Sequence, residues 1–230
     1  MDCGLHASVP TVGRVELALS ATGACALIEA RQTVLPKRLG APGPDEGQLQ
    51  QILRAAGAAP DHGERIPWRF VIVPPPARRA LAEVFAQSLA ARDPAATTQQ
   101  LAQAREKAHR APLLMLAVAR LTPSAADKAP DDERLVSAGC AIQNMLLIAT
   151  AQGFGSALTS GKALQSPGLR ALFTLKAYER ALCFINIGTA ASPKLRRARP
   201  LPADYVSALE PHDSACARRL ADEVSDSSPA

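Results

Sequence analysis

The sequence predicts a single α+β domain in which helices surround a central β-sheet. A length of 230 residues suits one domain with a substantial core. The chain is 47% hydrophobic but only 3% aromatic, so Ala, Leu, Val and Ile must fill that core, which favours closely packed helices. Stretches with helical spacing of apolar residues outnumber short, continuous apolar runs, and the two kinds are mixed along the chain.

The spacing of apolar residues also predicts where the domain begins and ends. We expect a domain over residues 21–207, with flexible extensions at 1–20 and 208–230, because both ends have weak periodicity and polar or small residues. Before residue 120 the predicted elements are a helix over 22–32, a Pro/Gly-rich connector over 36–44, a helix that Asp45 can cap, a strand over 68–73, helices over 77–92 and 97–109, and a buried strand over 113–119.

The second half of the domain is predicted to begin with its longest helix, over residues 131–152. Acidic Asp131, Asp132 and Glu133 suit a helix N-terminus, and the uncharged remainder predicts a helix that is buried nearly all round, rather than a membrane span. After this helix we expect a loop with a short extended piece beyond Gly153, a small helix near 167–173 and a buried strand over 181–187.

Charge and cysteine usage exclude several classes of function. The net charge of +5 is partly concentrated near Arg196, which could bind one phosphate, but aromatic residues are not interleaved with the basic ones. We therefore expect no nucleic-acid partner. The five cysteines are widely spaced and form no CxxC pair, so neither a disulfide framework nor a zinc site is indicated. A cytoplasmic protein without a secretory signal or a membrane partner is expected.

The residues themselves show no catalytic triad, metal cluster or phosphate-binding glycine loop. What remains is a set of polar and basic positions at the ends of predicted elements. Each has a plain structural explanation: Arg31 is a favourable cation at a helix C-terminus, and a lone loop histidine such as His62 commonly makes structural hydrogen bonds. Cys140 and Cys183 lie in apolar runs and are expected to be inert, buried thiols.

Read together, these positions resemble the small NAD(P)H nitroreductases over roughly residues 22–207. The likeness is carried by EARQT (29–33), ILRAAGAAPDHGERIPWRFVIV (52–73), SAGCAIQNMLLIATAQGFGSALTSG (137–161), FINIGTA (184–190) and RARP (197–200). The order APDH, PWRF, AQGFGS is hard to obtain by chance. The resemblance implies a nitroreductase-like layered fold with a mainly antiparallel central sheet, in an entwined homodimer that binds FMN at its interface.

The resemblance also implies which residues bind the cofactors. Members of the family hold FMN with the segment after the first helix, the APDH loop, the loop after the core helix and a late basic pair. Here these are Arg31, Gln32, Thr33, Ala58, His62, Leu158, Thr159, Ser160, Arg197 and Arg199. Gln32 stands where a second arginine is common, and Leu158 departs from a tryptophan found in one branch. The nicotinamide nucleotide is implied at Ile148, Ala149, Thr150, Ala151, Gln152 and Gly153.

The implied activity is a ping-pong transfer of electrons from NADH or NADPH through FMN to a nitroaromatic, quinone or similar small acceptor. No side chain and no metal is expected to be catalytic, because the chemistry takes place at flavin N5. Three alternatives stay open at this point. They are an enzyme on the same fold that fragments FMN or removes halogen, a flavin-binding regulatory protein without useful turnover, and a basic nucleic-acid-binding module.

Overall fold

The computed structural model describes residues 21–122, 129–192 and 198–209. They belong to two compact units, Met1–Lys194 and Leu195–Ala230. The described part of the second unit contains one short 3₁₀ turn, Pro202–Asp204. The expected extension at 1–20 lies outside the described residues, as does most of the one at 208–230, so the bounds of the 21–207 domain stay a prediction.

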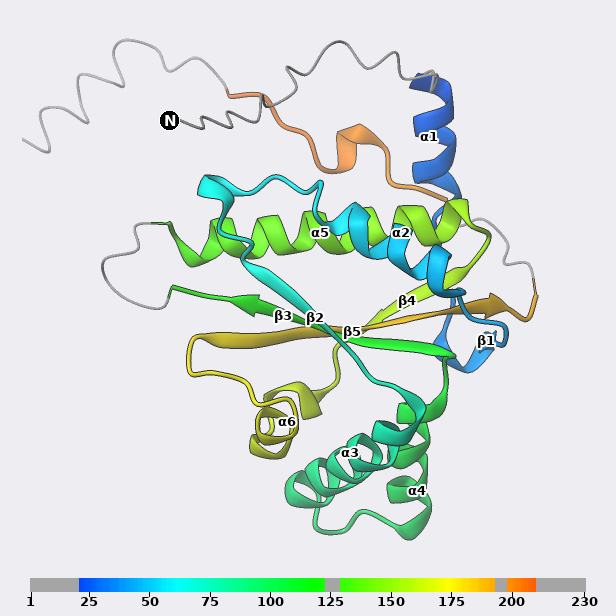
Figure 1. Ribbon diagram of the computed structural model, residues 1–230, viewed down its shortest axis with the longest axis vertical. Helices are drawn as coiled ribbons and strands as arrows, with labels where there is room; N and C mark the ends of the chain where they lie inside the picture. Colours follow the sequence, from blue (N-terminus) through cyan, green and yellow to red (C-terminus); the bar gives the residue numbers. More distant parts are fainter. Residues whose placement is uncertain (1–20, 123–128, 193–197, 210–230) are drawn as a thin grey trace, which may run out of the picture. The chain divides into compact units, whose positions relative to one another are not determined.

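The first unit is built on a five-stranded antiparallel sheet (Figure 1). Its strands are β1 (Leu39–Gly40), β2 (Trp68–Ile72), β3 (Leu113–Arg120), β4 (Gly155–Thr159) and β5 (Glu179–Ala190), in the order β1-β5-β3-β2, with β4 also paired to β5. Since Ile185 of β5 pairs with both Met115 and Leu158, β3 and β4 lie along opposite edges of β5. The predicted α+β class and mainly antiparallel sheet are confirmed. Strand β1 was not predicted, because its two residues lie within the Pro/Gly-rich connector.

Helices cover both faces of this sheet. Figure 1 shows α1 (Ala21–Ala30), α2 (Glu46–Ala56) and α5 (Asp131–Ala151) on one face, and α3 (Arg78–Arg92), α4 (Thr98–Glu106) and α6 (Pro167–Leu172) on the other. Helix α2 begins where expected, since the Asp45 carboxylate accepts a hydrogen bond from the Gln48 amide at 2.8 Å. The sheet therefore separates two apolar cores, one around Met145 and Ile185 and one around Leu81 and Phe184.

Helix α5 corrects one prediction. It is not buried all round: the residues that it buries lie three or four apart along one face, whereas Val136 is 67% exposed. The cause is that the sheet and α2 cover only one side of the helix, which composition cannot reveal. By length and composition alone α5 could cross a membrane, a test that core helices also pass. Here it packs antiparallel to α2, with the Gln152 side chain donating to the Gln48 carbonyl at 3.2 Å.

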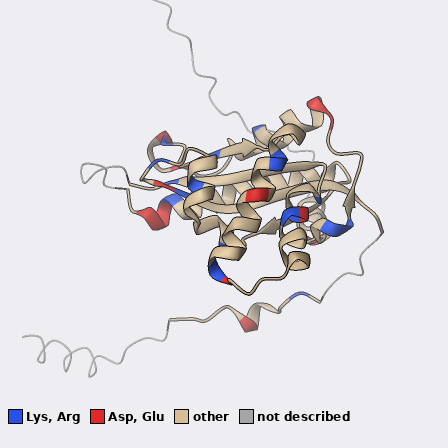
Figure 2. Cartoon of the chain, turned by 90° about the horizontal axis from the view of Figure 1, so that it is seen from below, with Lys and Arg blue, Asp and Glu red and all other residues tan. Residues whose placement is uncertain are grey.

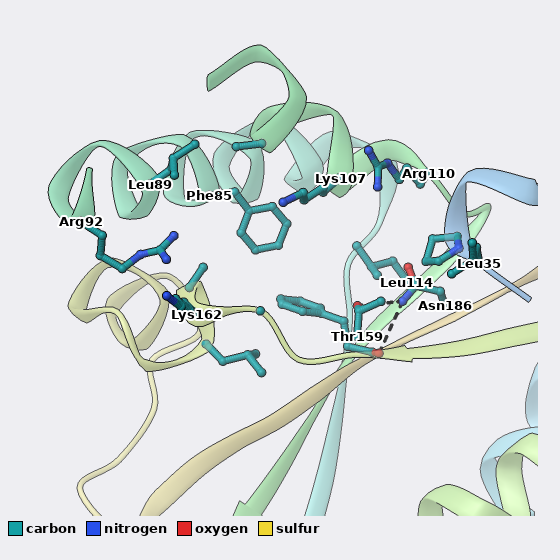
Figure 3. Close-up of a pocket in the computed structure, with 16 residues that line it drawn as sticks. Leu35, Phe85, Leu89, Arg92, Lys107, Arg110, Leu114, Thr159, Lys162 and Asn186 are labelled. Atoms are coloured by element: carbon teal, nitrogen blue, oxygen red, sulfur yellow. Dashed lines mark hydrogen bonds between the residues drawn. The ribbon is translucent and has the colours of Figure 1, made fainter. Parts of the chain in front are cut away.

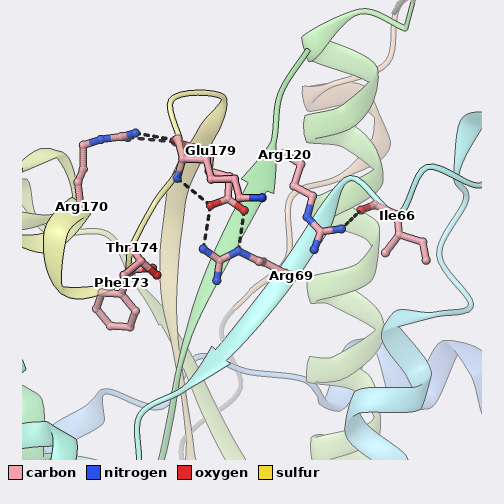
Figure 4. A network of polar contacts seen from close by, with 8 residues as sticks. Ile66, Arg69, Arg120, Arg170, Phe173, Thr174 and Glu179 are labelled. Atoms are coloured by element: carbon pink, nitrogen blue, oxygen red, sulfur yellow. Dashed lines mark hydrogen bonds and ion pairs between the residues drawn. The ribbon is translucent and has the colours of Figure 1, made fainter. Parts of the chain in front are cut away.

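A buried ion pair fixes the start of β5 against β2 (Figure 4). Nε and Nη2 of Arg69 donate to the two carboxylate oxygens of Glu179 at 2.7 and 2.8 Å. The Lys176 amide donates to the same carboxylate at 3.0 Å, and Arg170 donates to the Glu179 carbonyl at 3.0 Å. Glu179 is only 4% exposed, and the hydrogen bonds from Arg69 lower its pKa to about 2 against the opposing effect of burial.

Candidate active site

A cavity of about 380 Å³ lies between the α3–α4 hairpin and the sheet (Figure 3). Helices α3 and α4 are joined above it by an exposed ion pair, in which Arg105 donates two hydrogen bonds to Glu83, at 2.9 and 3.2 Å. Residues from the hairpin, β3, β4, β5 and the two loops beside β4 line the cavity. They are Leu35, Pro36, Phe85, Leu89, Arg92, Ala104, Lys107, Arg110, Leu114, Thr159, Gly161, Lys162, Ala163, Leu164, Phe184 and Asn186.

Asn186 orients a hydroxyl at one end of this cavity. It is 2% exposed, on β5, and its side-chain amide donates to Thr159 Oγ1 at 3.1 Å and to the Ala157 carbonyl at 3.3 Å. Since Thr159 Oγ1 is already an acceptor for Asn186, its own hydrogen is available to an acceptor in the cavity. Asn186 therefore makes Thr159 a hydrogen-bond donor toward the cavity.

Four basic residues line the cavity, namely Arg92, Lys107, Arg110 and Lys162. The described lining residues include no carboxylate. Arg110 Nη2 lies 3.3 Å from Glu106, but Arg110 Nε is buried and has no hydrogen-bond partner within the described part of the chain. An unsatisfied buried donor costs about 1–3 kcal/mol. A ligand with acceptor atoms would recover that free energy here.

The remaining walls of the cavity are apolar. Phe85 and Phe184 meet edge to face, with ring centroids 5.5 Å apart and an interplanar angle of 90°. Leu89, Leu114 and Leu164 also line it. Apolar walls with several donors suit a flat ligand that carries acceptor atoms or negative charge.

The predicted segment Arg31, Gln32 and Thr33 lies beside β4, next to this cavity. Thr33 forms a parallel bridge with Ser156, and the amide of the following Val34 donates to the Ser156 carbonyl at 2.8 Å. Gln32 faces a second hollow, of about 360 Å³, and its Oε1 is buried without a partner in the described chain. Leu35 and Pro36, which follow Val34, line the first cavity, whereas Gln32 and Val34 line the second. This segment therefore runs from one hollow to the other.

The predicted loop after α5 is brought to the same place only in part. Thr159 lines the cavity, and Ser160 precedes another lining residue, Gly161. Leu158 is 44% exposed and does not line it. Thr33 pairs with Ser156, three residues before Thr159 on β4, so the two predicted segments meet along this strand.

The predicted residues of the APDH loop lie elsewhere in the unit. His62 Nδ1 is 3.2 Å from Glu133 Oε2, at the N-terminal end of α5, and Ala58 is exposed after α2. Residues 148–153 occupy the opposite end of α5, about 28 Å away at 1.5 Å per residue. His62 lines a small hollow beside Glu133 and is not among the residues that line the α3–α4 cavity, so a single chain does not bring it there.

The predicted nicotinamide stretch, residues 148–153, is largely occupied by packing within the fold. Ala149 is fully buried, and the Thr150 hydroxyl donates to the Leu146 carbonyl at 2.8 Å. The Gln152 amide is bonded to α2, whereas Thr150 and Gly153 line the second hollow. Of the late basic pair, Arg197 lies outside the described residues, and Arg199 belongs to the second unit, which is described by itself.

Lys107, Arg110 and Asn186 were missed as site residues by the sequence prediction. The two basic residues were only assigned to the predicted helix over 97–109 and its end, whereas in the structure they follow α4 and line the cavity (Figure 3). Asn186 offered a signal that could have been used. A single amide inside an otherwise apolar strand must find a partner, and it often orients another polar side chain.

Comparison with known proteins identifies the family. The model of the nitroreductase family matches residues 28–189. A Haemophilus influenzae protein named "Putative NAD(P)H nitroreductase" is 34% identical over 174 residues, which cover 75% of this chain and 93% of that protein.

Solved structures share the fold at lower identity. A nitroreductase-like family protein from Bacillus cereus has a TM-score of 0.69 at 19% identity and covers 84% of this chain and 99% of its own. A nitroreductase with bound FMN from Bacteroides fragilis has a TM-score of 0.59 at 21% identity, with 81% and 98% covered. Because the family model spans most of the chain and the curated relative aligns over nearly its whole length, this chain belongs to the nitroreductase family of oxidoreductases.

Proposed function

We propose that this chain is an FMN-dependent oxidoreductase that passes electrons from NADH or NADPH to a small acceptor such as a nitroaromatic or a quinone, by a ping-pong mechanism. The observation that carries the proposal is the cavity of Figure 3, where apolar walls meet several hydrogen-bond donors, one of which, Arg110 Nε, is buried without a partner in the described chain. Bound FMN would supply the redox chemistry, which is the transfer of hydride or electrons between donor and acceptor. The protein's own task is then binding, orientation and exclusion of water.

The residues present fit a flavin. The polar edge of an isoalloxazine carries carbonyl oxygens and ring nitrogens, which accept hydrogen bonds, and the cavity offers donors from Thr159, Lys107 and Arg110. The buried, unpartnered Oε1 of Gln32 suits a hydroxyl donor of the ribityl chain. Arg31 and the late arginines Arg197 and Arg199 remain proposed partners of the phosphate. The FMN named in the Bacteroides fragilis structure supports this assignment.

We further propose that two copies form the active unit. Helix α1 buries none of its side chains within its own chain, and Ile28 on it is 54% exposed. The outer face of α5 is similarly uncovered at Val136. Exposed apolar helix faces of this kind mark protein interfaces. In an entwined homodimer, Ala58 and His62 of one chain could approach the flavin of the other, which a single chain does not allow.

A reducing cytoplasm is the proposed location. The described cysteines, Cys25, Cys140 and Cys183, form no disulfide. Burial raises the pKa of the Cys183 thiol to about 11, so this thiol stays protonated at neutral pH and is a poor nucleophile. This agrees with the inert character predicted for Cys183, whereas Cys140 is only half-buried.

An absorption spectrum of the purified full chain tests the proposed function. The spectrum is recorded before and after anaerobic addition of NADH or NADPH, and again after a nitroaromatic or quinone is added. We expect the bands of oxidised flavin, their loss with the nicotinamide and their return with the acceptor. A colourless protein that does not bind added FMN would contradict the proposal. Bound flavin that neither nicotinamide bleaches would instead indicate a binding protein.

A further inference from the structure

We propose that the end of the cavity formed by Arg92 and Lys162 binds the anionic group of the oxidising substrate, so that negatively charged aromatic compounds are the preferred acceptors. This inference rests on the proposed function, because it assigns the flavin to the other end of the same cavity. It adds a substrate class that family membership leaves open.

The two ends of the cavity differ in the residues that they present. Figure 3 shows Arg92 and Lys162 close together at one end, with Leu35, Arg110 and Asn186 at the other. Arg92 is the last residue of α3, and Lys162 opens the 3₁₀ turn Lys162–Gln165 that follows β4. These two cations therefore come from opposite walls of the cavity and lie close together at one end of it (Figure 3).

Neither cation at this end is neutralised by a carboxylate in the described structure. Arg92 Nε donates to the Ser88 carbonyl at 2.8 Å, which fixes its stem but leaves its charge uncompensated. Of the acids of the hairpin, Glu83 pairs with Arg105 and Glu106 with Arg110, whereas Asp93, next to Arg92, accepts a hydrogen bond from the Ala95 amide at 3.1 Å. Around the cavity, Lys and Arg are therefore in excess, although over the unit as a whole both signs of charge are interspersed (Figure 2). A negative ligand would be attracted to this end and would relieve the mutual repulsion of the two cations.

The space between the two ends selects for more than charge. Phe85, Leu89 and Leu164 line it, and Lys107 points its amine toward Phe85 (Figure 3). A small inorganic anion would leave these apolar walls in contact with water. An aromatic carboxylate would cover them while its charge reached Arg92 and Lys162.

Paired acceptors of equal size test this inference in the flavin-loaded full chain. The ratio of kcat/KM for para-nitrobenzoate to kcat/KM for the neutral para-nitrobenzamide is measured at low salt, for the natural chain and for Arg92→Gln/Lys162→Gln. We expect the double variant to lower the ratio roughly tenfold, because it removes the attraction for the nitrobenzoate charge, in the range for two exposed charges. Arg79→Gln is the matched control, because Arg79 is exposed on the same helix and does not line the cavity.

A binding measurement separates this inference from the proposed function. Calorimetric titration of naphthoate and of neutral naphthamide, which the flavin cannot reduce, should show a preference for naphthoate that the double variant loses. If this preference exists but NADH and NADPH fail to bleach the protein, the anion site stands and the proposed activity fails. An unchanged ratio in the double variant, or an equal fall in Arg79→Gln, would overturn the anion site.

Discussion

Two clusters of charged residues on this unit differ in how completely they are satisfied. At the start of β5, the Glu179 carboxylate accepts hydrogen bonds from Arg69 and from the Lys176 amide, although it is 4% exposed. Around the α3–α4 cavity, cations gather without a carboxylate among the described lining residues, and Arg110 Nε is buried without a partner. The first cluster is complete in the folded chain, and the second is not.

This difference distinguishes structural charge from functional charge. Burying an ion pair costs desolvation that only a full set of hydrogen bonds offsets, so a complete cluster such as that of Glu179 serves the fold. A donor that the fold leaves unsatisfied weakens the folded chain unless a ligand supplies the acceptor. The cavity cluster is therefore the one expected to bind a cofactor and a substrate.

Removing one partner of the complete cluster should give the largest effect on stability. In Arg69→Met the Glu179 carboxylate would be left buried without its counter-ion, and we expect the free energy of unfolding to fall by about 3–5 kcal/mol. Urea unfolding monitored by circular dichroism measures this change. The double variant Arg69→Met/Glu179→Leu should recover most of the loss, because it removes both charges. A loss below about 1 kcal/mol in the single variant would show that the pair is not structural.

Acid should weaken the same cluster. The pKa of Glu179 is lowered in the folded chain from 4.5 to about 2, so its contribution is fully present above pH 4.5 and disappears as the pH falls toward 2. A shift of this size corresponds to about 3 kcal/mol of stability. Unfolding free energies measured across this range should fall more steeply with acid in the natural chain than in Glu179→Gln. If the unfolding free energies of the two proteins fell in parallel with acid, the lowered pKa of Glu179 would be contradicted.

Local chemistry explains why most of the fold could be predicted from the sequence. The Asp45 cap, the three prolines after β2 and the acidic first turn of α5 act on their own neighbours, so they mark element ends directly. Two features depend on distant parts of the chain. Strand β1 exists because Leu39 and Gly40 pair with the far end of β5, and the half-covered α5 reflects which elements happen to pack on it.

The candidate site was less predictable, because its residues are gathered from distant elements. Gln32 was found only through the family resemblance, and Thr159, a polar residue after the glycines that follow α5, gained a role only through it. Lys107 and Asn186 are far from both in sequence, and it is the packing of the hairpin over the antiparallel sheet that brings them to one cavity. His62 shows the opposite case, a residue that was predicted for the site but lies outside the cavity. Its local sequence matches the family, yet in one chain it pairs with Glu133 away from the cavity.

The measurement that tests the central claim most directly is a fluorescence titration of FMN with the flavin-free full chain. It compares the natural chain with Lys107→Met/Arg110→Met and with the control Arg79→Gln. We predict one FMN bound per chain, an affinity at least roughly tenfold lower in the double variant, or about 1.4 kcal/mol, and no change in the control. Equal FMN affinity in the double variant and the natural chain would show that the cationic cavity is not the flavin site.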